Sequence, residues 1–188
     1  MAGVAGPLYA RARWKTARFL GGLALGGAVG GLILALPVYL LGTVAGYLPL
    51  WLRLVLLAVV CVALGVADLR DRTPHVWRQV PQAFVRTLPP GLLGLVWGFD
   101  LGLLVTTQKT TSLIWVAGAA VLLVRPDLSA LVLVSIATVA IAAVTVNTVT
   151  GLLPPERNVM AWLRYVRWAS GALLLVLPVT LLVTGLPR

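Results

Sequence analysis

Charged residues are scarce in this chain of 188 residues. Only 11% of its residues are Asp, Glu, Lys or Arg and 60% are hydrophobic, whereas soluble domains carry about 25% charged residues. The mean hydropathy is +1.01. So few charges cannot cover the surface of a soluble domain. The composition therefore excludes a water-soluble fold and predicts an integral membrane protein.

Acidic residues are the rarer of the two charged classes. Five acidic residues stand against fifteen basic ones, which gives a net charge of +10. The basic residues gather in short clusters between hydrophobic runs, as the positive-inside rule and an anionic cytoplasmic leaflet produce. We therefore expect a lipid bilayer as the partner and no nucleic acid. The predicted location is the plasma or inner membrane, with the N-terminus in the cytoplasm.

Cysteine and histidine are almost absent. Cys61 lies in an apolar run and His75 in a polar loop, and each is the only residue of its type. A single cysteine excludes an internal disulfide and a redox pair, and neither residue has the neighbours of a metal site. The sequence also has no Ser/His/Asp set and no HExxH motif. We predict no metal, no cofactor and no catalytic residue, which leans away from an enzyme.

Six hydrophobic segments predict an all-α bundle of about six transmembrane helices, in a single multi-pass domain. A basic arm at 1–18 precedes the first segment, and a basic loop at 68–88, predicted to be cytoplasmic, follows the second. The third and fourth segments would be about 25 and 20 Å long as helices, short of a hydrocarbon core of about 30 Å. Such short segments are typical of broken or re-entrant helices. The expected spans are 19–42, 50–67, 91–107, 112–124, 128–152 and 169–186.

The charge pattern leaves two topologies open. Six crossings place the loop at 68–88 inside together with the N-terminus, but they put one arginine cluster outside. Treating 91–124 as a single broken or re-entrant element gives five crossings and brings that cluster inside. We favour six crossings, because a stretch of that length is too long for one simple helix. The cluster consists of Arg157, Arg164 and Arg167.

Glycine recurs along one face of the first span. The repeated small-xxx-small spacing leaves a bare groove in which another helix can approach closely, and such packing drives helix association in lipid. We predict tight helix packing here, either within the chain or with a membrane-protein partner or a second copy. A permeation path along the groove is the alternative. The residues are Gly22, Gly26, Gly27, Gly30 and Gly31.

Asp100 is an acid inside an otherwise apolar run, between Gly98 and Gly102. An ionisable residue is costly in a bilayer, so it marks a candidate functional site. A polar break follows it, and the fifth span becomes polar in its second half. The polar side chains there either bond their own or a neighbouring helix, which is the favoured interpretation, or line a polar cavity with Asp100. The predicted substrate or ion contacts are Asp100, Thr106, Thr107, Gln108, Lys109 and Asn147.

One stretch resembles known proteins. Residues 77–115 read WRQVPQAFVRTLPPGLLGLVWGFDLGLLVTTQKTTSLIW, in which an Arg-Gln-Val loop precedes a glycine-punctuated span and a Thr-rich break. This pattern resembles small actinobacterial-type polytopic membrane proteins related to the cytochrome c biogenesis and DsbD-like transmembrane family. The resemblance implies a helical membrane bundle. The family's thiol electron transfer needs a cysteine in each of two broken helices, and the matching positions here hold none. That activity is therefore not carried over.

Two functions are favoured over a third, an enzyme that acts on lipids or thiols, for which no catalytic motif is found. The favoured one is a small transporter or permease component that uses an intramembrane carboxylate. The alternative is a non-enzymatic membrane subunit or assembly factor. In that case the glycine-rich first span would hold a partner, and Asp100 would be a structural polar contact.

Overall fold

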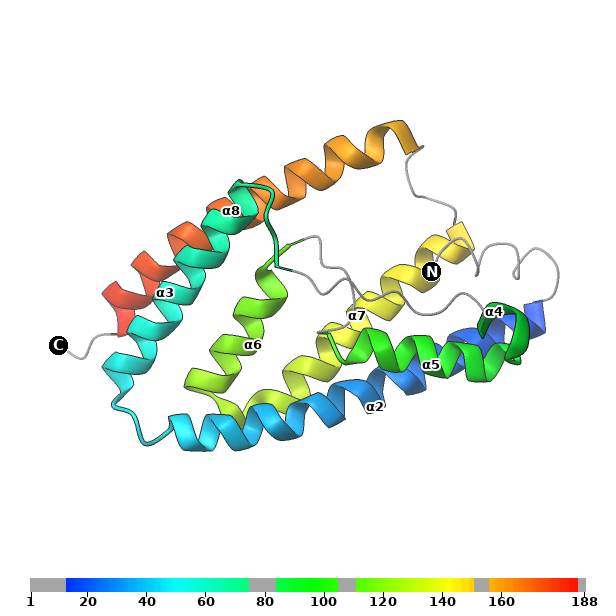
Figure 1. Ribbon diagram of the computed structural model, residues 1–188, viewed down its shortest axis with the longest axis horizontal. Coiled ribbons are helices and arrows are strands. Elements are labelled where there is room, and N and C mark those ends of the chain that lie inside the picture. Colours follow the sequence, from blue (N-terminus) through cyan, green and yellow to red (C-terminus); the bar gives the residue numbers. More distant parts are fainter. Residues whose placement is uncertain (1–12, 75–83, 105–110, 151–155, 186–188) are drawn as a thin grey trace. The chain divides into compact units, whose positions relative to one another are not determined.

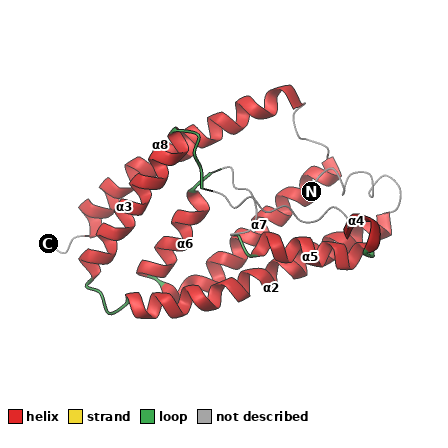
Figure 2. Ribbon diagram, viewed as in Figure 1, coloured by secondary structure: helices red, strands yellow, loops and turns green. Residues whose placement is uncertain are grey.

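The computed structural model describes residues 13–74, 84–104, 111–150 and 156–185 (Figure 1). All regular structure in these ranges is helical, and none of it is strand (Figure 2). The all-α prediction is therefore confirmed. The elements are α2 (Arg13–Ala45), α3 (Leu50–Leu69), α4 (Phe84–Thr87), α5 (Pro90–Gly102), α6 (Leu113–Val124), η1 (Pro126–Leu128), α7 (Ser129–Thr150) and α8 (Glu156–Gly185).

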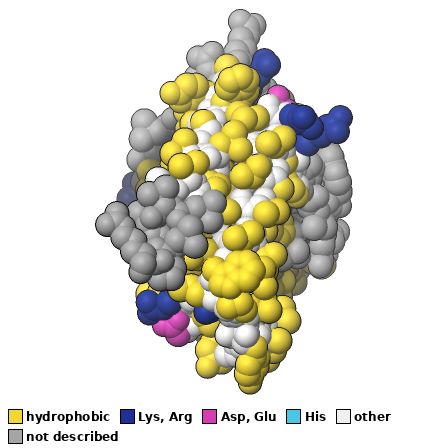
Figure 3. Space-filling model, turned by 90° about the vertical axis from the view of Figure 1, so that its left-hand side faces the viewer, with side chains coloured by type: hydrophobic (Ala, Val, Ile, Leu, Met, Phe, Trp, Pro, Cys, Tyr) yellow, Lys and Arg dark blue, Asp and Glu magenta, His cyan; other side chains and the backbone are white. Residues whose placement is uncertain are grey.

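Three helical stretches are long and apolar enough to cross a membrane: Arg13–Ala45, Leu50–Leu69 and Pro126–Val146. Many of their large hydrophobic side chains are exposed, as a bilayer requires and water does not favour. Figure 3 shows hydrophobic side chains over most of one face, with the charged side chains gathered toward its ends. These helices are those of a membrane protein.

The short third and fourth segments form short helices. α5 has 13 residues and α6 has 12, so neither alone matches the thickness of a hydrocarbon core. α5 ends at Gly102, five residues before the predicted end of its span. α8 begins at Glu156, well before the expected start at 169, because the aromatic and basic stretch before that point continues the same helix.

Contacts within the chain divide it into two compact units. Unit 1 contains residues 1–34, 76–107 and 133–153, and unit 2 contains 35–75, 108–132 and 154–188. The helices α2 and α7 each contribute to both.

Unit 1 is built on the glycine face of α2. Gly22, Gly26 and Gly30 lie successively against Gly91, Leu95 and Phe99 of α5, so the two helices run parallel. The contacts are backbone to backbone, because a Cβ on any of these three glycines would collide with a main-chain atom of α5. The core beside them includes an edge-to-face pair of rings with centroids 6.1 Å apart. Its buried members are Phe19, Leu23, Leu93, Trp97 and Ile141.

α7 packs on another part of the same glycine-rich stretch. Gly27 faces Ile141 and Gly31 faces Val134, so α7 runs antiparallel to α2. All five glycines predicted to pack helices therefore lie against helices of the same chain. The space they leave is filled within unit 1.

Unit 2 is built on α3, which lies beside α8 (Figure 1). Gly65 and Gly171 meet at a close approach of these two helices. The core between α3, α6 and α8 consists of Leu57, Cys61, Val116 and Leu174. The only cysteine is thus fully buried as a small apolar side chain.

Candidate functional site

The most extensive polar network in the described residues surrounds Asp68, in the last turn of α3. Asp68 is fully buried. Its carboxylate accepts hydrogen bonds from the Ser112 hydroxyl (2.6 Å) and the Ser112 backbone N–H (2.8 Å). The hydroxyls of Thr73 (2.8 Å) and Ser170 (2.9 Å) also donate to it. We call these four residues the Asp68 network.

The Asp68 network joins three helices and a turn. Ser112 is the N-cap of α6 and Ser170 belongs to α8, while Thr73 follows the end of α3. The Ser112 side chain makes no cap within its own helix. The carboxylate of Asp68 instead caps the N-terminal end of α6, where the helix dipole favours a negative charge. A buried carboxylate with this many donors is well satisfied and holds the helices together.

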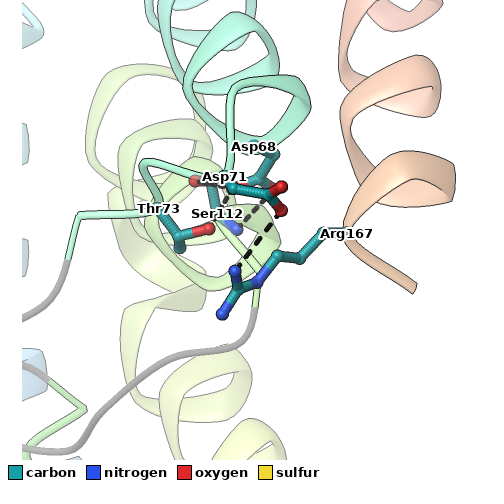
Figure 4. A network of polar contacts seen from close by, with 5 residues as sticks. All are labelled: Asp68, Asp71, Thr73, Ser112 and Arg167. Atoms are coloured by element: carbon teal, nitrogen blue, oxygen red, sulfur yellow. Dashed lines mark hydrogen bonds and ion pairs between the residues drawn. The ribbon is translucent and has the colours of Figure 1, made fainter. Parts of the chain in front are cut away.

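An ion pair lies next to this network. Asp71 and Arg167 approach to 3.4 Å, and both side chains are partly exposed. Asp71 has a positive φ of 55°, where the chain turns after α3. Figure 4 shows this pair beside Asp68, Thr73 and Ser112, with the Arg167 side chain reaching from α8. The end of α3 and this part of α8 therefore lie at the same end of unit 2.

α3 also reaches the opposite end of α6. The Arg53 guanidinium donates a hydrogen bond to the Leu123 carbonyl oxygen at 3.3 Å. That carbonyl lies in the last turn of α6, where the helix dipole favours a cation. α6 thus has an acid at its N-terminal end and a base at its C-terminal end, both supplied by α3, so the two helices are antiparallel.

The predicted site residue Asp100 lies in unit 1, near the C-terminal end of α5, and its side chain is only 7% exposed. The chain turns sharply after this helix, at Leu104, whose φ is 55°. Trp97 lies one turn earlier on the same helix and is also buried. Its indole N–H has no hydrogen-bond partner among the described residues. α5 therefore buries a carboxylate within two residues of its end.

The other predicted contacts cannot be placed around Asp100. Thr106, Thr107, Gln108 and Lys109 lie outside the described residues. Asn147 belongs to α7, but its side chain is likewise outside the described part. Within the described ranges, no three His, Cys, Asp or Glu side chains come together as metal ligands would. Asp100 is thus the one predicted contact residue whose burial the structure describes.

Sequence reasoning missed the role of Asp68. The sequence places Asp68 in the basic loop at 68–88, because Asp71 and several arginines follow it closely. A signal was present: Asp68 comes directly after an uninterrupted apolar run, and Ser112 comes directly before another. An acid at the end of one helix and a serine at the start of another form a capping pair when the two ends meet. Only the fold shows that they meet.

No protein-family model, curated protein or solved structure matches the chain. The resemblance of residues 77–115 to the cytochrome c biogenesis family stays a prediction. The function must therefore be argued from the geometry of the chain itself.

Proposed function

We propose that this chain is a small multi-pass membrane transport protein or permease component in which Asp100 binds a cation, in the simplest case a proton. The observation that carries the proposal is the buried carboxylate near the end of α5, a helix too short to cross a membrane. Short helices that end inside the membrane beside a buried ionisable group are typical of transport sites.

The contacts of α3 support a re-entrant α5. α3 ends at the same end of unit 2 where α6 begins, because Asp68 binds Ser112 directly. The chain between these two residues therefore leaves and returns on one side of the membrane. α5 is the only described helix of more than four residues in that interval. In our proposal α5 dips into the bilayer and comes back, and the five crossings are α2, α3, α6, α7 and α8. α6 counts as a crossing despite its length, because it is bonded to Asp68 at one end of α3 and to Arg53 at the other.

The packing of α5 on α2 also supports a re-entrant α5 that ends inside the bilayer. The end of α5 lies against Gly30, which follows Phe19, the start of the apolar part of α2, by eleven residues. Eleven residues of helix rise about 17 Å, roughly half of a hydrocarbon core. This packing supports our proposal that Asp100 lies near the middle of the bilayer.

The electrostatics near Asp100 favour a cation over an anion. The last carbonyl groups of a helix carry a partial negative charge, and Asp100 adds a carboxylate to that end of α5. In lipid, a buried carboxylate costs less free energy once it has taken up a proton or another cation. Alternating binding and release of that cation would couple to movement of a substrate.

The subunit alternative loses one of its supports. It relied on the glycine groove of α2 to hold a partner protein, and α5 and α7 of the same chain fill that groove. A partner would have to bind another surface. The transport proposal needs no such surface.

The experiment is a proton jump on the full-length protein reconstituted into liposomes on a solid-supported membrane. Proton binding to a carboxylate inside the bilayer displaces charge, so the wild type should give a transient current and Asp100→Asn should abolish it. The matched control is Asp127→Asn, an exposed acid paired with Arg125, which should keep the current. A wild type without a transient, or an Asp100→Asn variant that keeps it, would exclude the proposed role.

A further inference from the structure

The end of unit 2 at which α3 stops carries a group of arginines that the transport proposal does not use. Arg70 and Arg72 follow α3 directly and are exposed, and Arg164 is exposed on α8. The pair between Asp71 and Arg167 holds these two stretches of chain together. We call Arg70, Arg72, Arg164 and Arg167 the arginine rim.

Among the described residues, little negative charge neutralises the arginine rim. The one exposed acid described there is Asp71, which is paired with Arg167, while Asp68 is buried in its own network. The other three guanidinium groups make no hydrogen bond or ion pair with any described residue. Guanidinium groups bind phosphate oxygens through two parallel hydrogen bonds. The rim therefore suits a phosphate-bearing partner.

Aromatic side chains stand beside the arginine rim. Trp162, Tyr165 and Trp168 of α8 are 58%, 73% and 56% exposed. Their spacing of three residues places them along one side of the helix, away from buried Ser170 and Leu174. Exposed Trp and Tyr next to basic residues, at the end of apolar helices, are typical of the headgroup layer of a membrane.

We propose that the arginine rim is a binding site for anionic phospholipid, whose phosphate bridges α8 and the turn after α3. The apolar exposed surfaces of α3 and α8 begin where the rim ends, so acyl chains can lie along these helices while the headgroup stays at the rim. The bound lipid reinforces the contact that the Asp71–Arg167 pair makes. This site does not depend on Asp100 or on transport.

The test uses the purified full-length chain in neutral detergent, titrated separately with short-chain phosphatidylglycerol, short-chain phosphatidylcholine and inorganic phosphate. The readout is the thermal unfolding midpoint from tryptophan fluorescence. Phosphatidylglycerol should raise the midpoint well below the concentrations at which the other two act. The combined variant Arg72→Gln/Arg164→Gln should need roughly tenfold more phosphatidylglycerol for the same shift.

Arg125→Gln is the matched control, because Arg125 is exposed but lies at the other end of α6. It should respond to phosphatidylglycerol as the wild type does. Arg164→Gln alone is the milder variant if the double substitution does not fold, and it should weaken the response partially. Equal shifts with phosphatidylcholine or inorganic phosphate, or an unchanged response of the Arg164 variants, would overturn the proposal.

Discussion

Asp68 and Asp100 are both acids buried at the end of an apolar helix, yet the residues around them suit different tasks. Asp68 accepts four hydrogen bonds, which come from Thr73, Ser112 and Ser170. These donors stabilise the negative charge of the carboxylate. Asp100 lies near the C-terminal end of α5, where the helix dipole adds negative charge. Asp68 holds helices together in the structure, whereas cation exchange at Asp100 is our proposal.

We expect Asp68→Ala to lower the free energy of unfolding by about 3 kcal/mol or more, because it leaves several buried donors unpaired. The measurement is an unfolding titration of the purified protein in mixed micelles. Asp127→Ala is the control, since that carboxylate is exposed on a turn. This variant should have the same unfolding midpoint as the wild type. Equal stability of the Asp68 variant and the wild type would mean that the network does not support the fold.

Residue types alone indicated that Asp100 is buried and gave no sign that Asp68 is, for a physical reason. An acid in the middle of an apolar run stands out because the cost of burying it can be read from the sequence. An acid at the edge of such a run looks solvated, and its burial depends on where Ser112 and Ser170 come to lie. Those positions are 44 and 102 residues away in the chain. No local pattern carries that information.

At the scale of helices, glycine decides which elements of unit 1 pair. The four-residue spacing from Gly22 to Gly26 to Gly30 matches the spacing of Gly91, Leu95 and Phe99 on α5, so the backbones meet in register. The sequence predicted a groove but left its occupant open between the same chain, a second copy and another protein. Spacing shows which face is bare. It does not show which helix fills it.

Gly26→Ala should destabilise the protein by about 1–3 kcal/mol, because the added Cβ would collide with the Leu95 carbonyl and the backbones would have to separate. Gly21→Ala is the matched control in the same helix, where nothing lies within 4 Å of the added Cβ. There, alanine should raise stability by up to about 1 kcal/mol through its helix propensity. Unfolding midpoints of the two variants in one detergent check both signs, and identical midpoints would contradict the pairing.

At the scale of the whole molecule, our proposal of a re-entrant α5 gives five crossings, where the length of residues 91–124 favoured six. The ion pair between Asp71 and Arg167 supports the proposal, because it joins the turn after α3 to the basic part of α8. Six crossings would place them on opposite sides. The five-crossing arrangement also agrees with the clustering of positive charge, which the sequence analysis identified as its advantage.

Single-cysteine accessibility tests this topology in a Cys61→Ala background, where the native thiol is removed. Trp14→Cys and Tyr165→Cys should react with a membrane-impermeant maleimide from one side. Tyr47→Cys, in the turn between α2 and α3, should react from the other. All three native side chains are more than half exposed, at 67%, 73% and 91%. Labelling of Tyr165→Cys from the same side as Tyr47→Cys would exclude five crossings.

The pairing of α6 with α3 has a consequence for how the chain is made. α6 is too short to be held in a bilayer by its own length, and α3, which caps both its ends, is synthesised before it. The nascent chain therefore already contains α3, against which α6 packs, when α6 leaves the ribosome. Ser170 arrives only with the last helix, so the Asp68 network closes late. A chain truncated before α8 should keep this acid incompletely bonded and the Gly65 face of α3 uncovered, so we expect cellular proteases to degrade it faster than the full-length chain.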